Sequence, residues 1–152
     1  MRRALLLFLL CSCGPGEPLT FEIKLDALNV EEIQISIVKN GRGLDCIAVQ
    51  KTCLVDQILN DRFVRVQASN GTEAPAIRFP VTAKDVTING IPVGKDYALV
   101  IEALTNDKPP KLAGSSCDYL AEIGPGVNPR KLAIPIKALA VAVACDPRVE
   151  KN

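Results

Sequence analysis

The chain has 152 residues, 48% of them hydrophobic, and a formal net charge of +1 at neutral pH. This length is typical of one domain that buries a core of its own, so the fold need not depend on a metal. The domain contains no run of basic residues, which excludes the clustered cations that nucleic-acid binding requires.

The first fourteen residues, MRRALLLFLLCSCG, have the organisation of an export signal. Arg2 and Arg3 precede a short apolar run that ends at Leu10. This run is too short to cross a membrane, because a spanning helix needs about 20 apolar residues. An ordinary cleaved secretory signal has the same charged and apolar regions. The cysteine directly after Ser12 favours lipidation instead.

The segment Leu10-Cys11-Ser12-Cys13 resembles the lipobox of bacterial lipoprotein precursors, whose cysteine is acylated and becomes the first residue of the mature protein. The resemblance implies a signal peptide over residues 1–12 and a lipid anchor on Cys13. In lipoproteins that this chain resembles, an aspartate after the cysteine commonly retains the protein at the inner membrane. Gly14 occupies that position here. The resemblance therefore implies an outer-membrane protein that faces the periplasm or the exterior.

Residues 13–18 are expected to be the lipidated cysteine and a short tether, because the glycines and prolines of 14–18 disfavour regular structure. The domain then spans residues 19–152. Alternating apolar residues predict a half-buried strand over 19–25. A second strand over 32–38 places Ile33, Ile35 and Ile37 inward and Gln34 and Ser36 outward.

Turn residues and a short helical pattern follow the second strand. Asn40-Gly41-Arg42-Gly43 predicts a tight turn, and the apolar spacing in 53–59 permits one or two helical turns. Further strands are predicted over 62–68, 76–81 and 86–88, with a turn at 69–72. Pro80 indicates that the strand over 76–81 lies at a sheet edge.

The stretch from Ile91 to Leu104 is the most informative part of the domain. Pro92 and Gly94 predict a turn, and a long strand begins at Tyr97. This Ile-Pro-x-Gly-x-x-Tyr pattern is similar to strand starts in immunoglobulin-like and prealbumin-like sandwich modules of bacterial surface proteins. The resemblance implies that the Tyr97 hydroxyl bonds back to the chain. True immunoglobulin domains differ, since this chain has no Trp.

The last part of the chain is predicted to be β-structure as well. A short strand over 118–123 is followed by Gly124-Pro125-Gly126-Val127-Asn128-Pro129, which predicts a hairpin connection. One strand region over 131–144 then ends at Cys145. The whole pattern predicts an all-β fold, an antiparallel β-sandwich of about seven to eight strands.

Four cysteines remain once Cys11 and Cys13 are assigned to the signal segment. An even number in an exported domain predicts two disulfides, for which three pairings are possible. Pairing the neighbours gives the lowest contact order, whereas a bond from Cys46 to Cys117 ties the two halves together. A zinc site is disfavoured, because the chain has no histidine and no Cys-x-x-Cys. The four candidates are Cys46, Cys53, Cys117 and Cys145.

No catalytic constellation is recognisable. The absence of histidine excludes Ser-His-Asp and Cys-His arrangements, and no serine occurs in Gly-x-Ser-x-Gly. Ser115 and Ser116 are interpreted as loop residues, and Glu31 and Glu32 as a solvated pair. We therefore expect neither an enzyme nor a cofactor or metal site.

The expected function is that of a membrane-anchored lipoprotein whose sandwich binds another envelope protein through a sheet edge or through loops. The alternative is a lipoprotein that binds a small ligand or a metal, or that serves as the accessory subunit of an envelope enzyme. A concave pocket with convergent polar groups would favour the alternative.

Overall fold

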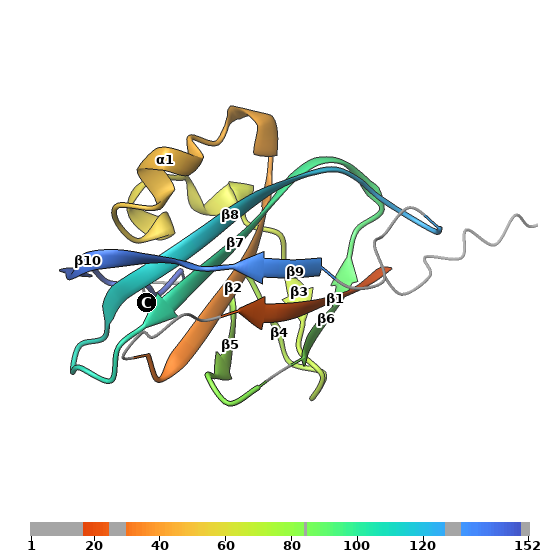
Figure 1. Ribbon diagram of the computed structural model, residues 1–152. Helices are drawn as coiled ribbons and strands as arrows, with labels where there is room; N and C mark the ends of the chain where they lie inside the picture. The colour runs from red at the N-terminus through yellow and green to blue at the C-terminus, as the bar shows by residue number, and fades with distance from the viewer. Residues whose placement is uncertain (1–16, 25–29, 84, 127–131, 150–152) are drawn as a thin grey trace, which may run out of the picture.

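The computed structural model describes residues 17–24, 30–83, 85–126 and 132–149 as two five-stranded sheets packed face to face (Figure 1). The predicted all-β sandwich is therefore confirmed. In spatial order the first sheet consists of β4 (Glu73–Ala74), β3 (Val66–Gln67), β6 (Asp85–Ile91), β1 (Glu17–Lys24) and β9 (Leu132–Pro135). The second consists of β10 (Lys137–Ala144), β8 (Lys111–Ile123), β7 (Gly94–Leu104), β2 (Glu32–Lys39) and β5 (Ile77–Pro80).

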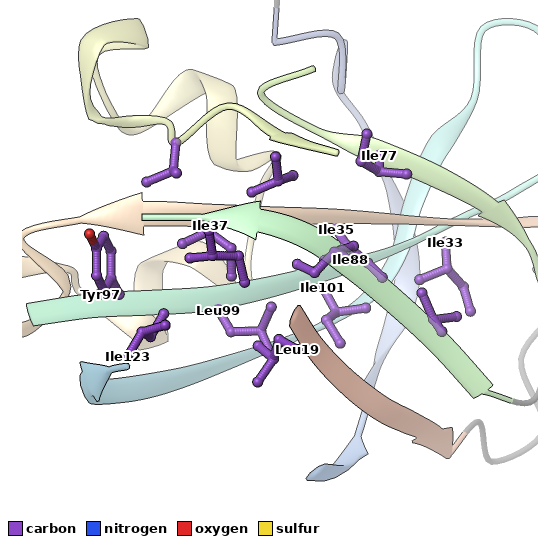
Figure 2. Packing of buried hydrophobic residues seen from close by; sticks show 14 of the residues in the cluster. Leu19, Ile33, Ile35, Ile37, Ile77, Ile88, Tyr97, Leu99, Ile101 and Ile123 are labelled. Atoms are coloured by element: carbon purple, nitrogen blue, oxygen red, sulfur yellow. The ribbon is translucent and has the colours of Figure 1, made fainter. Parts of the chain in front are cut away.

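The hydrophobic core lies between the two sheets. Alternate residues of β2 and β7 enter it from the second sheet, and Leu19 and Ile88 meet them from the first (Figure 2). Each isoleucine or leucine buried in this way stabilises the fold by about 1.5–3 kcal/mol. The predicted inward set is confirmed, since Ile33, Ile35 and Ile37 are fully buried.

The strand count and one pairing differ from the prediction. The described residues form ten strands, two of which have only two residues each. β1 begins at Glu17, two residues before the predicted strand. Its pairing with β9 is parallel, which departs from the expected antiparallel pattern. The finer likeness to immunoglobulin-like or prealbumin-like modules stays a prediction.

The predicted strand region over 131–144 is divided between the sheets. β9 pairs with β1 in the first sheet, and β10 pairs with β8 in the second. Ile136 lies between β9 and β10 and is buried in the core. Pro135, the last residue of β9, has no backbone N–H group to donate to a neighbouring strand. The predicted hairpin at 124–129 is wrong for the same reason, because β8 and β9 lie in different sheets. Part of that segment lies outside the described residues.

The turn between β6 and β7 contains the predicted tyrosine bond. Tyr97 Oη donates a hydrogen bond of 3.1 Å to the Pro92 carbonyl. A Cβ on residue 94 would lie 2.8 Å from the same Oη, so any side chain there would have to displace the Tyr97 ring. Burial of the phenol also raises the pKa of Tyr97. The hydroxyl therefore stays protonated and keeps donating.

Tyr97→Phe is expected to lower the free energy of unfolding by about 1 kcal/mol, because the Pro92 carbonyl loses its donor. Gly94→Ala is expected to cost about 1–3 kcal/mol, because the added methyl group displaces the Tyr97 ring. Urea unfolding followed by circular dichroism measures both. Tyr119→Phe is the matched control, since that phenol is 43% exposed. Equal stability of the Tyr97 and Tyr119 variants would contradict the role of the Tyr97 hydroxyl.

Candidate functional site

The outer face of the second sheet, which points away from the core, is covered by two irregular segments. We call residues 41–63 the cap and residues 145–149 the strap. The cap contains η1 (Gly41–Gly43), α1 (Cys46–Val49), η2 (Leu54–Asp56) and η3 (Asn60–Arg62). Figure 1 shows α1 lying beside β8 at the upper left.

Local sequence explains how the cap begins and why it packs closely. Asn40 has φ of 55°, as the predicted Asn-Gly turn requires. Any side chain at Gly41 would collide with the Tyr97 backbone. Asp45 Oδ1 then accepts hydrogen bonds from the backbone N–H groups of Ile47 and Ala48, which caps α1. The predicted helical turn over 53–59 is present as the short 3-10 helix η2.

The cover on the outer face overturns one prediction for β2. Gln34 and Ser36, expected to face solvent, are only 2% and 1% exposed. The cap buries Val49, Leu54 and Phe63 in a second hydrophobic cluster on this face, to which the strap contributes Val149. Both faces of β2 are therefore buried. Ser36 Oγ has no hydrogen-bond partner among the described residues.

Two disulfides fasten the cap and the strap. Cys46 of α1 is bonded to Cys117 of β8, and Cys53 is bonded to Cys145 at the start of the strap. All four predicted candidates are thus disulfide-bonded. The neighbour pairing of lowest contact order is not the one formed. The bonds run from the cap to the sheet and from the cap to the strap.

One transverse row of polar side chains crosses the outer face. These residues lie opposite one another on successive strands, from β5 to β10, and their middle members are buried under the cap. A continuous polar row on a covered face needs internal hydrogen-bond partners. The row consists of Arg78, Gln34, Glu102, Ser115 and Lys137.

Glu102 is the centre of a buried hydrogen-bond network. Its Oε1 accepts from the backbone N–H of Leu54 in the cap at 2.8 Å, and its Oε2 accepts from Gln34 Nε2 at 3.0 Å. Gln34 Nε2 also donates to the Pro147 carbonyl of the strap at 2.7 Å. Arg78 Nε donates to Gln34 Oε1 at 2.9 Å. One carboxylate and one amide therefore join the sheet, the cap and the strap.

Burial raises the pKa of Glu102 to about 7. The N–H of Leu54, the amide of Gln34 and the charge of Arg78 oppose this rise, and Asp56 adds to it. Removal of water is the dominant cause, because a carboxylate that is 1% exposed loses nearly all its hydration. The protonation of Glu102 therefore changes near neutral pH.

Two cavities adjoin the strap at the open end of this row. One of about 390 Å³ is lined by Gln34, Arg78 and Val149, among others, and one of about 570 Å³ lies between the strap and the β7–β8 turn. Arg78 and Arg148 line both cavities. The two cavities beside the strap thus share two of their cationic residues.

Large apolar side chains are exposed on the cap. Ile47 is 70% exposed and Leu59 is 72% exposed, whereas Val49 and Leu54 of the same segment are buried. Arg42 of the cap lies over the ring of Tyr119 of β8, 5.7 Å from its centroid, and donates to its hydroxyl at 3.2 Å. The cap therefore offers apolar contact positions next to a cation–aromatic pair.

The other predicted site residues have different outcomes. Cys13, the signal peptide and residues 14–16 of the tether lie outside the described residues. Ser115 and Ser116, interpreted as loop residues, lie buried in β8. Within 17–24, 30–83, 85–126 and 132–149, no three histidine, cysteine or acidic side chains are grouped to hold a metal ion. No helix in this part of the chain is long and apolar enough to cross a membrane.

Glu102 and Arg78 were not identified as site residues from the sequence, although the sequence contains one signal for Glu102. Glu102 is the only charged residue between Tyr97 and Leu104, in a run that is otherwise apolar. A lone carboxylate in such a strand predicts a buried group with internal partners. Arg78 gave no comparable signal, because its importance depends on the pairing of β5 with β2.

Comparisons with known proteins give no relative from which a role for these residues could be carried over. No protein-family model matches the chain, and neither the curated proteins nor the solved structures contain a match.

Proposed function

We propose that this chain is a membrane-anchored bacterial lipoprotein whose non-catalytic β-sandwich binds another protein of the cell envelope through the cap. The signal resemblance at residues 10–13 supports the anchor. The two disulfides support export, because such bonds form and persist in oxidising compartments. Gly14 after Cys13 supports the outer membrane as the site of attachment.

The observation that carries the binding role is the fastening of the cap by both disulfides. A segment with little regular structure is held on a rigid sheet while Ile47 and Leu59 stay exposed. Binding residues commonly lie on loops that a rigid scaffold positions, and fixing a loop beforehand reduces the entropy lost on binding. The cap therefore has the features of a preorganised contact surface.

The sheet edges are less suited to this role. β5 ends at Pro80 and β9 at Pro135, and β4 has only two residues. In β10, residues 139–142 lie opposite the single residue Ala113, so the strand bulges away from regular pairing. Proline and bulges obstruct the addition of a further strand. The cap is thus favoured over strand addition.

The anchor is tested by labelling cells with an alkyne analogue of palmitate. The full chain is expected to incorporate the label and to fractionate with membranes, and Cys13→Ala is expected to abolish both. Cys11→Ala is the matched control, because that residue is removed with the signal peptide and its loss leaves the acylated cysteine in place. Unchanged labelling of the Cys13 variant, or loss of labelling in the Cys11 variant, would refute the proposed anchor.

The binding surface is tested by placing a photoreactive benzoylphenylalanine at residue 47, 59 or 141 of the full chain in living cells. Crosslinks to one discrete protein band are expected from positions 47 and 59. Val141 on β10 is the control, since it is 79% exposed and apolar but lies outside the cap. A crosslink pattern shared by all three positions, or crosslinks from 141 alone, would count against the cap.

A further inference from the structure

We infer that the 570 Å³ cavity between the strap and the β7–β8 turn binds a small organic anion, in which a carboxylate or phosphate group is joined to a short apolar body. This inference goes beyond the proposed anchoring and protein binding and depends on neither. It follows from the charge of the cavity lining, from the way in which one arginine is held, and from the apolar walls.

The lining combines cations with apolar walls. Arg78, Lys111 and Arg148 supply three positive charges, against the single carboxylate of Asp146. Pro109, Pro110 and the strap form most of the remaining wall. The volume lies within the range of ordinary small-ligand sites, which are mainly apolar with a few placed polar groups. Glu32 and Asp107, the carboxylates nearest to Arg78 and Lys111, lie outside the lining. Positive charge therefore exceeds negative charge at the cavity wall, which favours an anion, and the apolar walls favour a hydrocarbon body.

Arg78 is held in place by buried groups. Its Nε donates to Gln34 Oε1 at 2.9 Å, and Gln34, only 2% exposed, is itself bonded to Glu102 and to the strap. Its Nη1 lies 3.6 Å from Glu32 Oε2, which is a long ion-pair distance. Within the described part of the chain, Nη2 has no partner. The guanidinium is therefore fixed in position and retains donors for an anionic oxygen.

The other two cations form ion pairs near the surface of the cavity. Lys111 Nζ lies 3.2 Å from Asp107 Oδ2, and Arg148 Nη2 lies 2.8 Å from Asp146 Oδ2. The side chains of Lys111 and Arg148 are 43% and 72% exposed. The exposed Lys111 pair contributes little to stability, so an anion that enters the cavity competes with it at small cost. Arg148 is held more firmly, because its Nε also donates to Asp146 Oδ1 at 2.9 Å, and it contributes a fixed cation to the cavity lining.

The site lies where the strap meets the buried network. Pro147 accepts a hydrogen bond from Gln34, and its neighbours Asp146 and Arg148 line the cavity. Cys145, also in the lining, is fixed to Cys53. One wall is thus held by a disulfide and by a buried amide. A wall fixed in this way keeps the cavity shape without a bound ligand.

The test is equilibrium dialysis of the purified full chain in non-ionic detergent against radiolabelled hexanoate and hexyl phosphate. Hexylamine and hexanol are run in parallel, and a cell with detergent alone corrects for partitioning into micelles. Saturable binding of at least one anion, with a stoichiometry of one, is expected. The ratio of the two affinities distinguishes a carboxylate ligand from a phosphate ligand. Equal binding of hexanol or hexylamine, or no saturable binding of either anion, would overturn the inference.

Variants locate the binding. Arg78→Gln and Arg148→Gln are each expected to weaken anion binding at least tenfold. Arg148→Gln is included because it leaves the Gln34 network intact, so a folding defect cannot explain its loss of binding. Lys95→Gln, which removes a charge at a side chain 76% exposed and outside the cavity lining, is expected to bind as the wild type does. Retained binding in both arginine variants would refute the site.

Discussion

Removing the disulfide between Cys53 and Cys145 is expected to lower the free energy of unfolding by roughly 4 kcal/mol, the largest effect predicted for this chain. The bond joins residues that are 92 positions apart, so its loss releases a long loop in the unfolded state. Cys53 is also fully buried against Leu104 and Leu112, so the variant loses packing as well. The cap and the strap lose their direct covalent connection.

The measurement is guanidinium unfolding of the Cys53→Ala/Cys145→Ala double variant, made as a pair so that no free thiol remains. Cys46→Ala/Cys117→Ala is the matched comparison, with a separation of 71 residues. Removing this second disulfide is expected to lower the free energy of unfolding slightly less, because Cys46 is only partly buried. An effect below about 1 kcal/mol for either pair would show that the cap is held by packing alone.

The stability of the fold is expected to decrease as the pH rises from 4.5 to above 7, because of Glu102. Its pKa is raised from 4.5 to about 7 in the folded state, so the folded chain binds a proton that the unfolded chain has already released. The contribution is fully present below pH 4.5 and is lost as the pH rises through 7. Its size is roughly 3 kcal/mol, from 1.36 kcal/mol per pKa unit.

Glu102→Gln is expected to abolish this slope. The variant should be less stable than the wild type at pH 5, by about 1–2 kcal/mol. The glutamine side chain has only one acceptor oxygen, so its NH2 group would face another donor, either Gln34 Nε2 or the Leu54 N–H. Its stability should match or exceed that of the wild type at pH 8. Urea unfolding at pH 5, 6, 7 and 8 measures both curves.

Glu122→Gln is the control for the pH experiment, since that exposed carboxylate pairs with Lys95 on the surface. Its slope should equal that of the wild type. Asp107, whose pKa is lowered by Thr105 and Lys111, acts in the opposite sense, but only as the pH falls below its usual range. A wild-type slope identical to that of the Glu102 variant would show that Glu102 does not titrate in this window.

The inner face of β2 could be predicted from the sequence, whereas its outer face could not. Alternation of Ile33, Ile35 and Ile37 identifies the core side, because a strand places every second residue on one face. The same rule assigns Gln34 and Ser36 to solvent, because alternation within one strand does not show that a later segment covers its outer face. The cap gives a helical signal only over residues 53–59, which is too short to indicate where the segment packs, so its position depends on tertiary packing.

Disulfide partners and the candidate ligand site were beyond prediction for related reasons. Even parity of the cysteines predicts two bonds, but it carries no information on which chain segments meet. Arg78, Lys111 and Arg148 come from three separate parts of the chain, and only the path of the strap brings them to one cavity. By contrast, the Tyr97 bond was predictable, since its partner lies five residues away in the same turn.

The disulfide pairing also bears on how the protein matures. The two bonds are interleaved, because the second opens at Cys53 before the first closes at Cys117. If the chain is exported N-terminus first, as proposed above, Cys46 and Cys53 emerge together well before their true partners. An oxidant acting in order of emergence would join these two first, and thiol–disulfide exchange would then have to rearrange them. Maturation of this protein should accordingly depend on a disulfide isomerase as well as on an oxidase.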